Sequence, residues 1–185
     1  MREAWRLAQT DLDPREVVFL DETSTPLTLT PQRARAPKGQ RAIGQVPRGH
    51  RPHIVWIATL TADGLGASLV VDGPMDGRVF VAFVERVLVP SLRPGQTVVL
   101  DNLSVHKNAR ARQLIEAAGC HLRFLPPYSP DFNPIEQAFA KSKQRLRRQR
   151  PRSWDAVNAA ITDLLPTITT HDAWAFFAAA GFPLA

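Results

Sequence analysis

The stretch Val17-Val18-Phe19-Leu20-Asp21-Glu22 places four apolar residues of high β propensity directly before two acidic ones. This pattern predicts a buried strand that ends at the acidic pair. A carboxylate at the end of a buried strand is costly unless it is paired, hydrogen-bonded or bound to a metal. Adjacent strand residues face opposite ways, so Asp21 and Glu22 compete for a role in any one site. The residues alone leave that choice open.

Further strands and helices follow this stretch in an alternating order. Apolar runs predict strands over residues 53–60, 65–71, 97–100 and 121–125, the first two forming a hairpin around Asp63-Gly64. Helical spacing of apolar residues predicts helices over residues 76–89, 106–118, 133–150, 153–165 and 172–180. This order predicts an α/β domain whose mixed five-stranded sheet is flanked by helices.

Composition agrees with one folded domain. The chain has 185 residues, 44% of them hydrophobic and 22% charged, which is typical of globular proteins and argues against disorder. The single cysteine, Cys120, excludes an internal disulfide and a cysteine-based zinc cluster, and it suits a reducing cytosol. No apolar run approaches the roughly 20 residues that a membrane span needs. We therefore expect a cytoplasmic protein without a membrane partner.

The positive charge, +6 in total, is concentrated in two segments. Residues 23–62 contain no acidic residue but six basic ones, and seven of the twelve residues in 141–152 are basic. The first segment is rich in Thr, Pro, Gly and Arg, and we expect a long loop or loose hairpin with a basic insertion at about 23–52. Tracts of one charge sign attract polyanions, most often nucleic acid. The alternative is a basic surface with no dedicated ligand.

Two further carboxylates stand where chemistry could occur. Asp101 follows the apolar run 98–100, and Glu136 falls in the first turn of a helix after a proline-rich loop. Converging carboxylates without a His/Cys cluster suit Mg²⁺ or Mn²⁺, and two such ions can drive phosphodiester cleavage. Glu136 has a second interpretation. With Asn133 as N-cap and Pro134 at the first helical position, it occupies the capping-box position.

His106 lies five residues after Asp101 and has three candidate roles: catalytic base, phosphate contact or helix-start residue. We favour the last two, because a two-metal site needs no histidine base. The remaining histidines show no metal-ligand spacing and are expected to be structural or exposed: His50, His53, His121 and His171.

Three motifs stand out together: Phe19-Leu20-Asp21-Glu22, Leu100-Asp101-Asn102 with His106-Lys107, and Leu125-Pro-Pro-Tyr-Ser-Pro-Asp-Phe-Asn-Pro-Ile-Glu136. They resemble the catalytic region of DDE transposases, and most of all the bacterial insertion-sequence branch of the mariner superfamily. The 34 residues between Asp101 and Glu136 also fit. The resemblance covers about residues 17–150. It departs at Phe139, where relatives often carry tryptophan.

The resemblance implies an RNase H-like fold in which Asp21, rather than Glu22, joins Asp101 and Glu136 as catalytic residues that hold two Mg²⁺ or Mn²⁺ ions. It further implies a transposase catalytic subunit, which cleaves DNA and transfers strands to move an insertion sequence. On this basis we divide the chain into an N-terminal extension (1–16), a catalytic domain (17–150) and a C-terminal helical extension packed on the same domain (151–185).

The resemblance also implies partners: the element ends and the target DNA, with a homodimer as one assembly that it allows. Relatives carry helix-turn-helix modules before the catalytic domain. The first catalytic strand here begins by Val17, so we expect a DNA-binding half that is encoded separately or reached by frameshifting. The setting would be the bacterial cytoplasm, at the nucleoid. The residues expected to contact DNA are Arg33, Arg35, Lys38, Arg41, Asn102, His106, Lys107, Lys141, Lys143, Arg147, Arg148 and Arg150.

Two alternatives to this function remain open. One is a non-catalytic DNA-binding remnant of a transposase, which would keep the fold and the basic tracts. The other is an RNase H-like nuclease without strand transfer, such as a ribonuclease H or a junction resolvase. The Pro-Tyr-Ser-Pro loop weighs against the nuclease.

Overall fold

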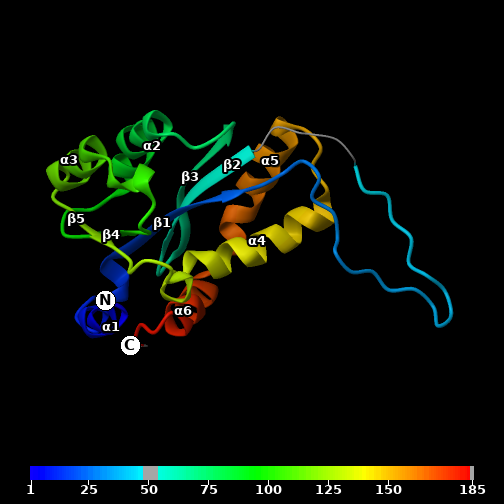
Figure 1. Ribbon diagram of the computed structural model, residues 1–185, viewed down its shortest axis with the longest axis horizontal. Coiled ribbons are helices and arrows are strands. Elements are labelled where there is room, and N and C mark those ends of the chain that lie inside the picture. Colours follow the sequence, from blue (N-terminus) through cyan, green and yellow to red (C-terminus); the bar gives the residue numbers. More distant parts are fainter. Residues whose placement is uncertain (48–53, 184–185) are drawn as a thin grey trace.

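The computed structural model describes residues 1–47 and 54–183 and has one mixed sheet at its centre (Figure 1). Its strands are β1 (Val17–Ser24), β2 (Ile54–Thr61), β3 (Gly64–Asp72), β4 (Thr97–Leu100) and β5 (His121–Phe124). They lie in the order β3-β2-β1-β4-β5. The first three strands are antiparallel neighbours, whereas β4 and β5 run parallel to β1. The predicted mixed five-stranded sheet is confirmed.

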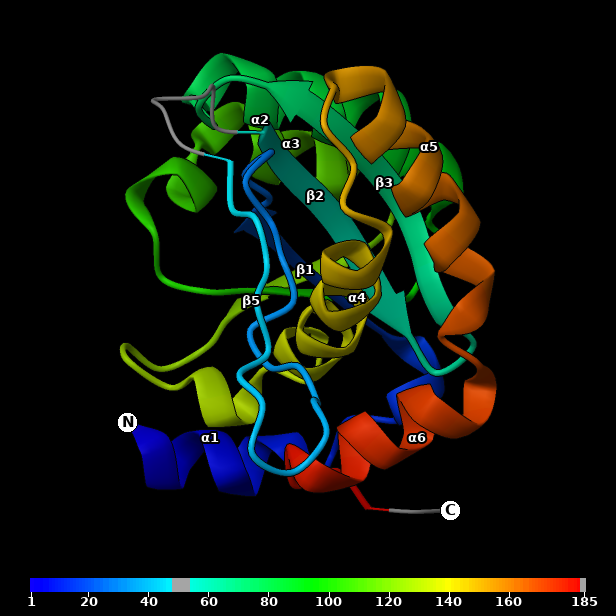
Figure 2. The same ribbon diagram turned by 90° about the vertical axis from the view of Figure 1, so that its right-hand side faces the viewer.

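Helices cover both faces of the sheet, because the apolar residues of each strand alternate between two cores. Val17 and Phe19 of β1 belong to one core, and Val18 and Leu20 belong to the other. The first core also takes up residues from α1 (Arg2–Gln9), α4 (Ile135–Gln149), α5 (Trp154–Leu164) and α6 (Thr170–Ala179). The second takes up α2 (Gly77–Phe83), its π-helical continuation Val84–Leu88, and α3 (Ala109–Ala117). Figure 2 shows α4, α5 and α6 gathered on one side of the sheet.

Aromatic contacts fix α4 and α6 against the sheet. The rings of Trp56 and Phe139 lie 5.0 Å apart, and those of Phe19 and Phe177 lie 5.5 Å apart, both edge to face. Such pairs add about 0.5–1.5 kcal/mol beyond the area they bury. Phe139 therefore anchors α4 on β2, and this contact sets where the first turn of α4 lies relative to the strand ends.

The N-terminal helix joins the same body. Trp5 is buried in the first core, and the Gln9 side chain donates a hydrogen bond of 2.9 Å to the carbonyl of Ala180. At the other end of α1, Arg2 forms an ion pair of 2.6 Å with Asp131. Both ends of α1 are thus tied to segments that follow the sheet in the chain. No helix of the described residues is both long and apolar enough to cross a membrane.

The segment between β1 and β2 has two parts. Leu27 and Leu29 are buried in the first core, and Arg152 donates hydrogen bonds of 2.7 and 2.8 Å to their carbonyl oxygens. Residues 31–46, which we call the arm, are exposed throughout, contain no helix or strand, and extend away from the body (Figure 1). The described part of this segment forms the long loop that was expected, and residues 48–53, which include Arg48, His50, Arg51 and His53, lie outside the described residues.

Most helix boundaries differ from their predictions by one or two residues, and the largest difference at a helix start concerns α3. The helix expected from residue 106 begins at Ala109, because the Asn108 side chain accepts hydrogen bonds from the backbone N–H groups of Arg110 and Ala111. Residues 104–107 form a separate 3₁₀ turn. This turn carries His106 back over the end of the sheet.

Candidate active site

Asp21 lies inside strand β1, which continues past the predicted end to Ser24. Its side chain is 6% exposed and accepts two hydrogen bonds, from the Asn133 amide (2.7 Å) and from the backbone N–H of Glu22 (2.8 Å). Burial raises the pKa of Asp21 to about 7; the backbone hydrogen bond opposes this, and the charges of nearby carboxylates add to it. The contributing carboxylates are Glu22, Asp101 and Glu136.

Asp101 directly follows β4, which pairs in parallel with β1. The carboxyl ends of parallel neighbours meet at one edge of a sheet, which brings Asp101 toward Asp21. Its Oδ1 accepts a hydrogen bond of 2.9 Å from the Leu103 backbone and lies 2.5 Å from Nδ1 of His106. Burial alone would raise the pKa of Asp101, but the contacts with His106 and Leu103 outweigh it and lower that pKa.

Glu136 lies in the first turn of α4, and the capping interpretation of this residue is wrong. The helix begins at Ile135, and no side chain caps its N-terminus in the described structure. Asn133, the expected N-cap, instead turns its amide toward Asp21. Glu136 is exposed, and its carboxylate is near enough to add to the electrostatic field at both Asp21 and Lys143.

All three carboxylates line one pocket of about 450 Å³. The proline-rich loop over residues 125–130 forms another wall, and Asn133 and Lys107 also reach the pocket. At its rim Tyr128 adopts a left-handed backbone conformation (φ 53°) and is 99% exposed. The sequence analysis did not single out this tyrosine, although it lies in the Pro-Tyr-Ser-Pro loop of the third motif.

The chemistry of these groups fits a divalent cation. Among the described residues, the buried carboxylate of Asp21 accepts hydrogen bonds only from neutral groups, the Asn133 amide and the Glu22 backbone. In the same described part of the chain, Oδ1 of Asn133 is buried without a hydrogen-bond partner. Hard oxygen donors of this kind suit Mg²⁺ or Mn²⁺. As the described side chains stand, no three His, Cys, Asp or Glu residues are arranged around one ion. The three carboxylates therefore share a pocket without enclosing an ion position in the described structure.

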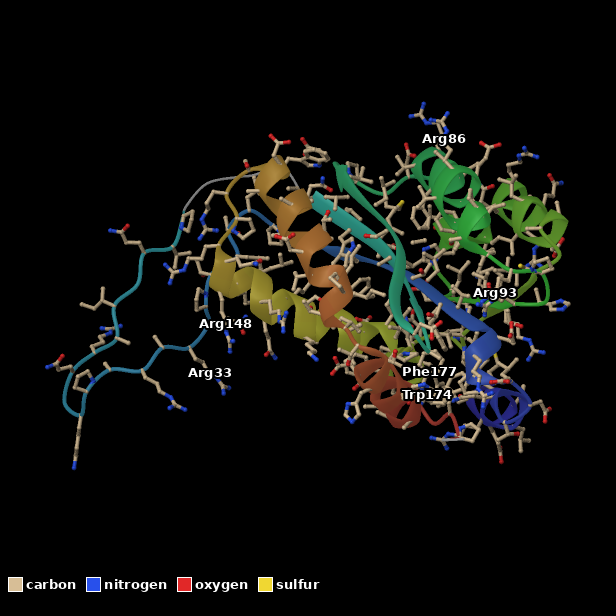
Figure 3. The ribbon with its side chains drawn as sticks, turned by 180° about the vertical axis from the view of Figure 1, so that it is seen from behind. Arg33, Arg86, Arg93, Arg148, Trp174 and Phe177 are labelled. Atoms are coloured by element: carbon tan, nitrogen blue, oxygen red, sulfur yellow. The ribbon has the colours of Figure 1, made fainter. Side chains whose placement is uncertain are left out.

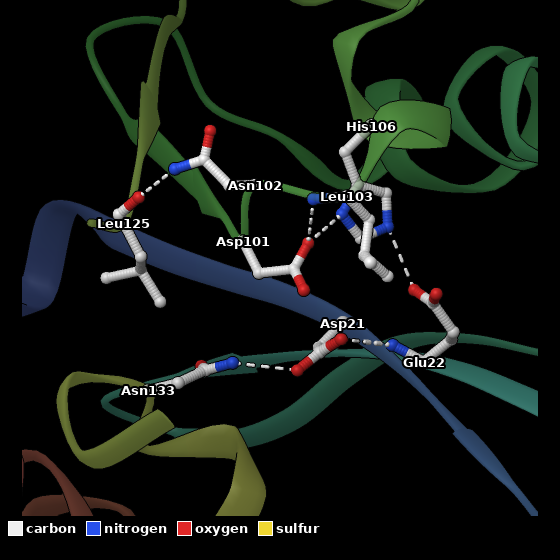
Figure 4. A network of polar contacts seen from close by, with 8 residues as sticks. All are labelled: Asp21, Glu22, Asp101, Asn102, Leu103, His106, Leu125 and Asn133. Atoms are coloured by element: carbon white, nitrogen blue, oxygen red, sulfur yellow. Dashed lines mark hydrogen bonds and ion pairs between the residues drawn. The ribbon is translucent and has the colours of Figure 1, made fainter. Parts of the chain in front are cut away.

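His106 differs most from its prediction. The side chain is 0% exposed and packs on Phe80, with ring centroids 4.9 Å apart. Nδ1 faces Asp101, and Nε2 lies 2.8 Å from Oε2 of Glu22, as Figure 4 shows. Burial would lower the pKa of His106, but hydrogen bonds with Asp101 and Glu22 raise it to about 9. Both expected roles, phosphate contact and helix-start residue, are therefore wrong.

Asn102 and Lys107, the neighbours of this network, have separate tasks. The Asn102 amide donates to the carbonyl of Leu125 and so joins the end of β4 to the start of the proline-rich loop (Figure 4). Lys107 is exposed at the pocket and remains available to an anionic ligand. Of the two, only Lys107 presents a free cationic group of the kind that a phosphate contact needs.

Apart from Lys107 at the pocket, the predicted DNA-binding cations lie in two segments, the arm and the region of α4. Those of the arm are all exposed: Arg33, Arg35, Lys38 and Arg41. Along α4, Lys141 is paired with Asp172 at 2.5 Å, Lys143 is half-buried with its pKa lowered by burial, and Arg148 and Arg150 are exposed. Figure 3 shows Arg33 and Arg148 at the same end of the molecule, where the arm leaves the body. The usable basic surface of α4 therefore begins after Lys141.

A family model described as "DDE superfamily endonuclease" matches residues 16–158. Among curated protein sequences, none matches the chain.

Solved structures of Mos1 mariner transposase share the fold. The strand transfer complex of Mos1 matches with a TM-score of 0.78 at 17% identity, over 97% of this chain and 56% of that one. Its paired-end complex with Mg gives 0.78 at 16% identity, over 97% and 58% of the two chains. The catalytic domain of Mos1 gives 0.69 at 14% identity, over 99% and 91%. The chain thus spans little more than half the length of the longer transposase chains, but nearly all of the catalytic domain. The RNase H-like fold expected from the sequence is confirmed.

Proposed function

The chain belongs to the DDE superfamily endonucleases, and we propose that it is the catalytic part of a transposase, which cleaves DNA strands and joins the resulting 3′-hydroxyl to target DNA. One observation carries this proposal. Asp21 and Asp101 lie just beyond the paired stretch of the parallel neighbours β1 and β4, and with Glu136 they line one pocket. Ligand sites of open α/β sheets gather at these strand ends.

Within this site, we propose that Asp21, Asp101 and Glu136 hold two Mg²⁺ or Mn²⁺ ions. When bound, such ions activate a water or hydroxyl nucleophile and stabilise the leaving oxygen. The protein's own part is positioning. Asn133 orients Asp21, and the backbone of Leu103 orients Asp101, so that each carboxylate enters the reaction in a fixed direction. Buried donors that hold acceptors in place need no rearrangement during the reaction.

We propose DNA, both the element end and the target, as the substrate. The exposed cations of the arm and of the C-terminal half of α4 would contact the phosphate backbone, which carries affinity without sequence information. Tyr128 offers an exposed ring at the rim of the pocket, and aromatic rings of this kind stack on unpaired bases. Lys107 would hold a phosphate beside the carboxylates.

Other parts of the assembly are also proposals. Reading of the terminal repeat would fall to a helix-turn-helix half supplied by another chain or by frameshifting, and the active form could be a homodimer. We place the reaction in the bacterial cytoplasm, at the nucleoid. The domain division into residues 1–16, 17–150 and 151–185 is retained as a proposal, with α1, α5 and α6 contributing to the same core as the sheet.

A strand-transfer assay tests this function. A labelled duplex with a recessed 3′-hydroxyl end is incubated with a supercoiled plasmid, the protein and Mn²⁺, and joined products are separated on a gel. Label in the plasmid supports the transposase. Nicking without joining would indicate the RNase H-like nuclease, and DNA binding with neither reaction would indicate a non-catalytic remnant. Glu136→Gln serves as the inactive control.

A further inference from the structure

The contact between His106 and Glu22 lies outside the set of catalytic residues yet connects directly to it. The imidazole of His106 is fully buried and has a carboxylate oxygen at each ring nitrogen, 2.5 Å away at Asp101 and 2.8 Å away at Glu22. Glu22 follows Asp21 in β1, and adjacent strand residues face opposite ways. Its carboxylate does not line the pocket but contacts His106, and Figure 4 shows it on the opposite side of Asp21 from Asn133.

We propose that Glu22 and His106 form a positioning relay for Asp101, which fixes the direction of this carboxylate toward the cation site. The proposal rests on the proposed metal-dependent function. His106 acts through Asp101 and Glu22 acts through His106, so both are positioning residues rather than catalytic ones. Neither role depends on the DNA sequence that the protein cuts.

The geometry at Asp101 explains what the relay achieves. Oδ1 of Asp101 takes both polar contacts, from the Leu103 backbone and from His106, whereas Oδ2 receives no hydrogen bond from the described residues. One oxygen is thus anchored and the other is left for the pocket, which Asp101 lines. A free aspartate would rotate about its side-chain bonds. Partners that orient a ligating group typically change metal affinity or activity 10–100-fold when they are lost.

A purely structural histidine would explain less. Packing on Phe80 accounts for the burial of the ring, but a core histidine needs only one polar partner at each nitrogen, and neutral groups would serve. Here both partners are carboxylates, and one of them is a residue of the proposed cation site. The Glu22 side chain is only 17% exposed. Burying a carboxylate costs free energy unless it is paired or hydrogen-bonded, so packing alone does not explain a glutamate at this position.

Two substitutions separate the two halves of the relay. In His106→Asn the amide nitrogen can occupy the place of Nδ1 and keep the contact with Asp101. In His106→Gln it can occupy the place of Nε2 and keep the contact with Glu22. Both variants lose the ring from Phe80 and one polar contact, so their melting temperatures in EDTA should fall by similar amounts. His171→Gln, on the exposed start of α6, is the matched control.

The experiment measures the response of each variant to Mn²⁺ in two ways. One is the rise in melting temperature that Mn²⁺ causes without DNA, and the other is the Mn²⁺ concentration that half-saturates plasmid nicking. We expect His106→Gln to need 10–100-fold more Mn²⁺ in both readouts, and His106→Asn to stay within a few-fold of the wild type. Equal responses of the two variants, or wild-type responses from both, would overturn the relay. So would a wild type that Mn²⁺ does not stabilise.

A second variant covers the case in which His106→Gln does not fold. Glu22→Ala leaves the ring of His106 in its place on Phe80 but removes its outer partner. We expect a several-fold rise in the Mn²⁺ requirement, and an unchanged requirement would overturn the role of Glu22. Failure of the proposed function would give a different result from failure of the relay. The wild type would then leave the plasmid intact, while the order of the variants in the melting experiment would still report on the relay.

Discussion

Replacing Asp21 by Asn should make the metal-free protein more stable at neutral and alkaline pH. Asp21 is buried, and its pKa is raised from 3.8 to about 7, mainly by burial. Above pH 7 the folded protein must therefore carry a buried negative charge close to other carboxylates. An amide of the same shape removes that charge. If the Asn133 amide reverses, the new side chain can still bond to Asn133 and to the Glu22 backbone.

The size of the effect follows from the shift. A rise of about three pKa units corresponds to about 4 kcal/mol of lost folding free energy once Asp21 ionises. This is an upper value, because relaxation of the site and entry of water lower the effective penalty of a buried charge. We therefore expect a gain of about 2 kcal/mol at pH 8. For a chain of this length that is a rise in Tm of roughly 4–8 °C.

Proton linkage determines whether the stability gain of Asp21→Asn grows or shrinks with pH. A carboxyl group whose pKa is higher in the folded state makes a contribution that is fully favourable below its unfolded pKa, near pH 4, and is lost as the pH rises through 7. The advantage of Asp21→Asn should thus shrink as the pH falls from 8 to 5. Thermal melting in EDTA at both values measures it, with Asp11→Asn on the surface as control. Equal stability of Asp21→Asn and the wild type at pH 8, or a stability gain that does not change with pH, would contradict a raised pKa of Asp21 in the folded protein.

Three further substitutions follow from the structure. Glu136→Ala should change the free energy of unfolding by less than about 0.5 kcal/mol, because no cap is lost; a loss of 1 kcal/mol or more in urea unfolding would restore the capping interpretation. Arg152→Ala should cost about 1–3 kcal/mol, because two carbonyl groups under the base of the arm lose a charged donor; the exposed Arg148→Ala is its control, and an equal effect of the two would contradict this. Replacing the four basic residues of the arm by Ala should reduce the slope of log K against log salt for unrelated duplexes by about 3.6 if each contacts one phosphate, and an unchanged slope in an anisotropy titration would exclude the arm from DNA contact.

Much of the fold could be predicted because its signals are local. Strand β4 was predicted at its observed bounds, since the run Thr97-Val98-Val99-Leu100, which has high β propensity, lies between the turn at Pro94-Gly95 and Asp101. The prediction placed the start of α3 too early, at residue 106. The side chain of Asn108 caps the helix, which therefore begins at Ala109. Helical spacing shows which residues share a face, but it does not show where capping interrupts the chain.

The site was less predictable wherever one side chain had two competing partners. Asn133-Pro134 has the sequence of a helix cap, yet in three dimensions Asn133 meets Asp21, 112 residues away, and bonds to it instead. A phosphate contact was favoured for His106 because the sequence does not indicate that Glu22, 84 residues away, lies beside it. The resemblance to a family singles out the three carboxylates proposed as catalytic, whereas strand ends alone leave Asp21 and Glu22 as competing candidates.

Plasmid nicking by the three carboxylate variants tests the central claim most directly, namely that these residues form one metal-dependent site. Wild type, Asp21→Asn, Asp101→Asn and Glu136→Gln are compared on supercoiled plasmid with Mg²⁺, with Mn²⁺ and with EDTA. We predict nicking by the wild type with either metal, none in EDTA, and loss of nicking to background in every variant, although each variant remains folded by thermal melting. Wild-type nicking by Glu136→Gln would contradict the claim, as would nicking by the wild type that persists in EDTA.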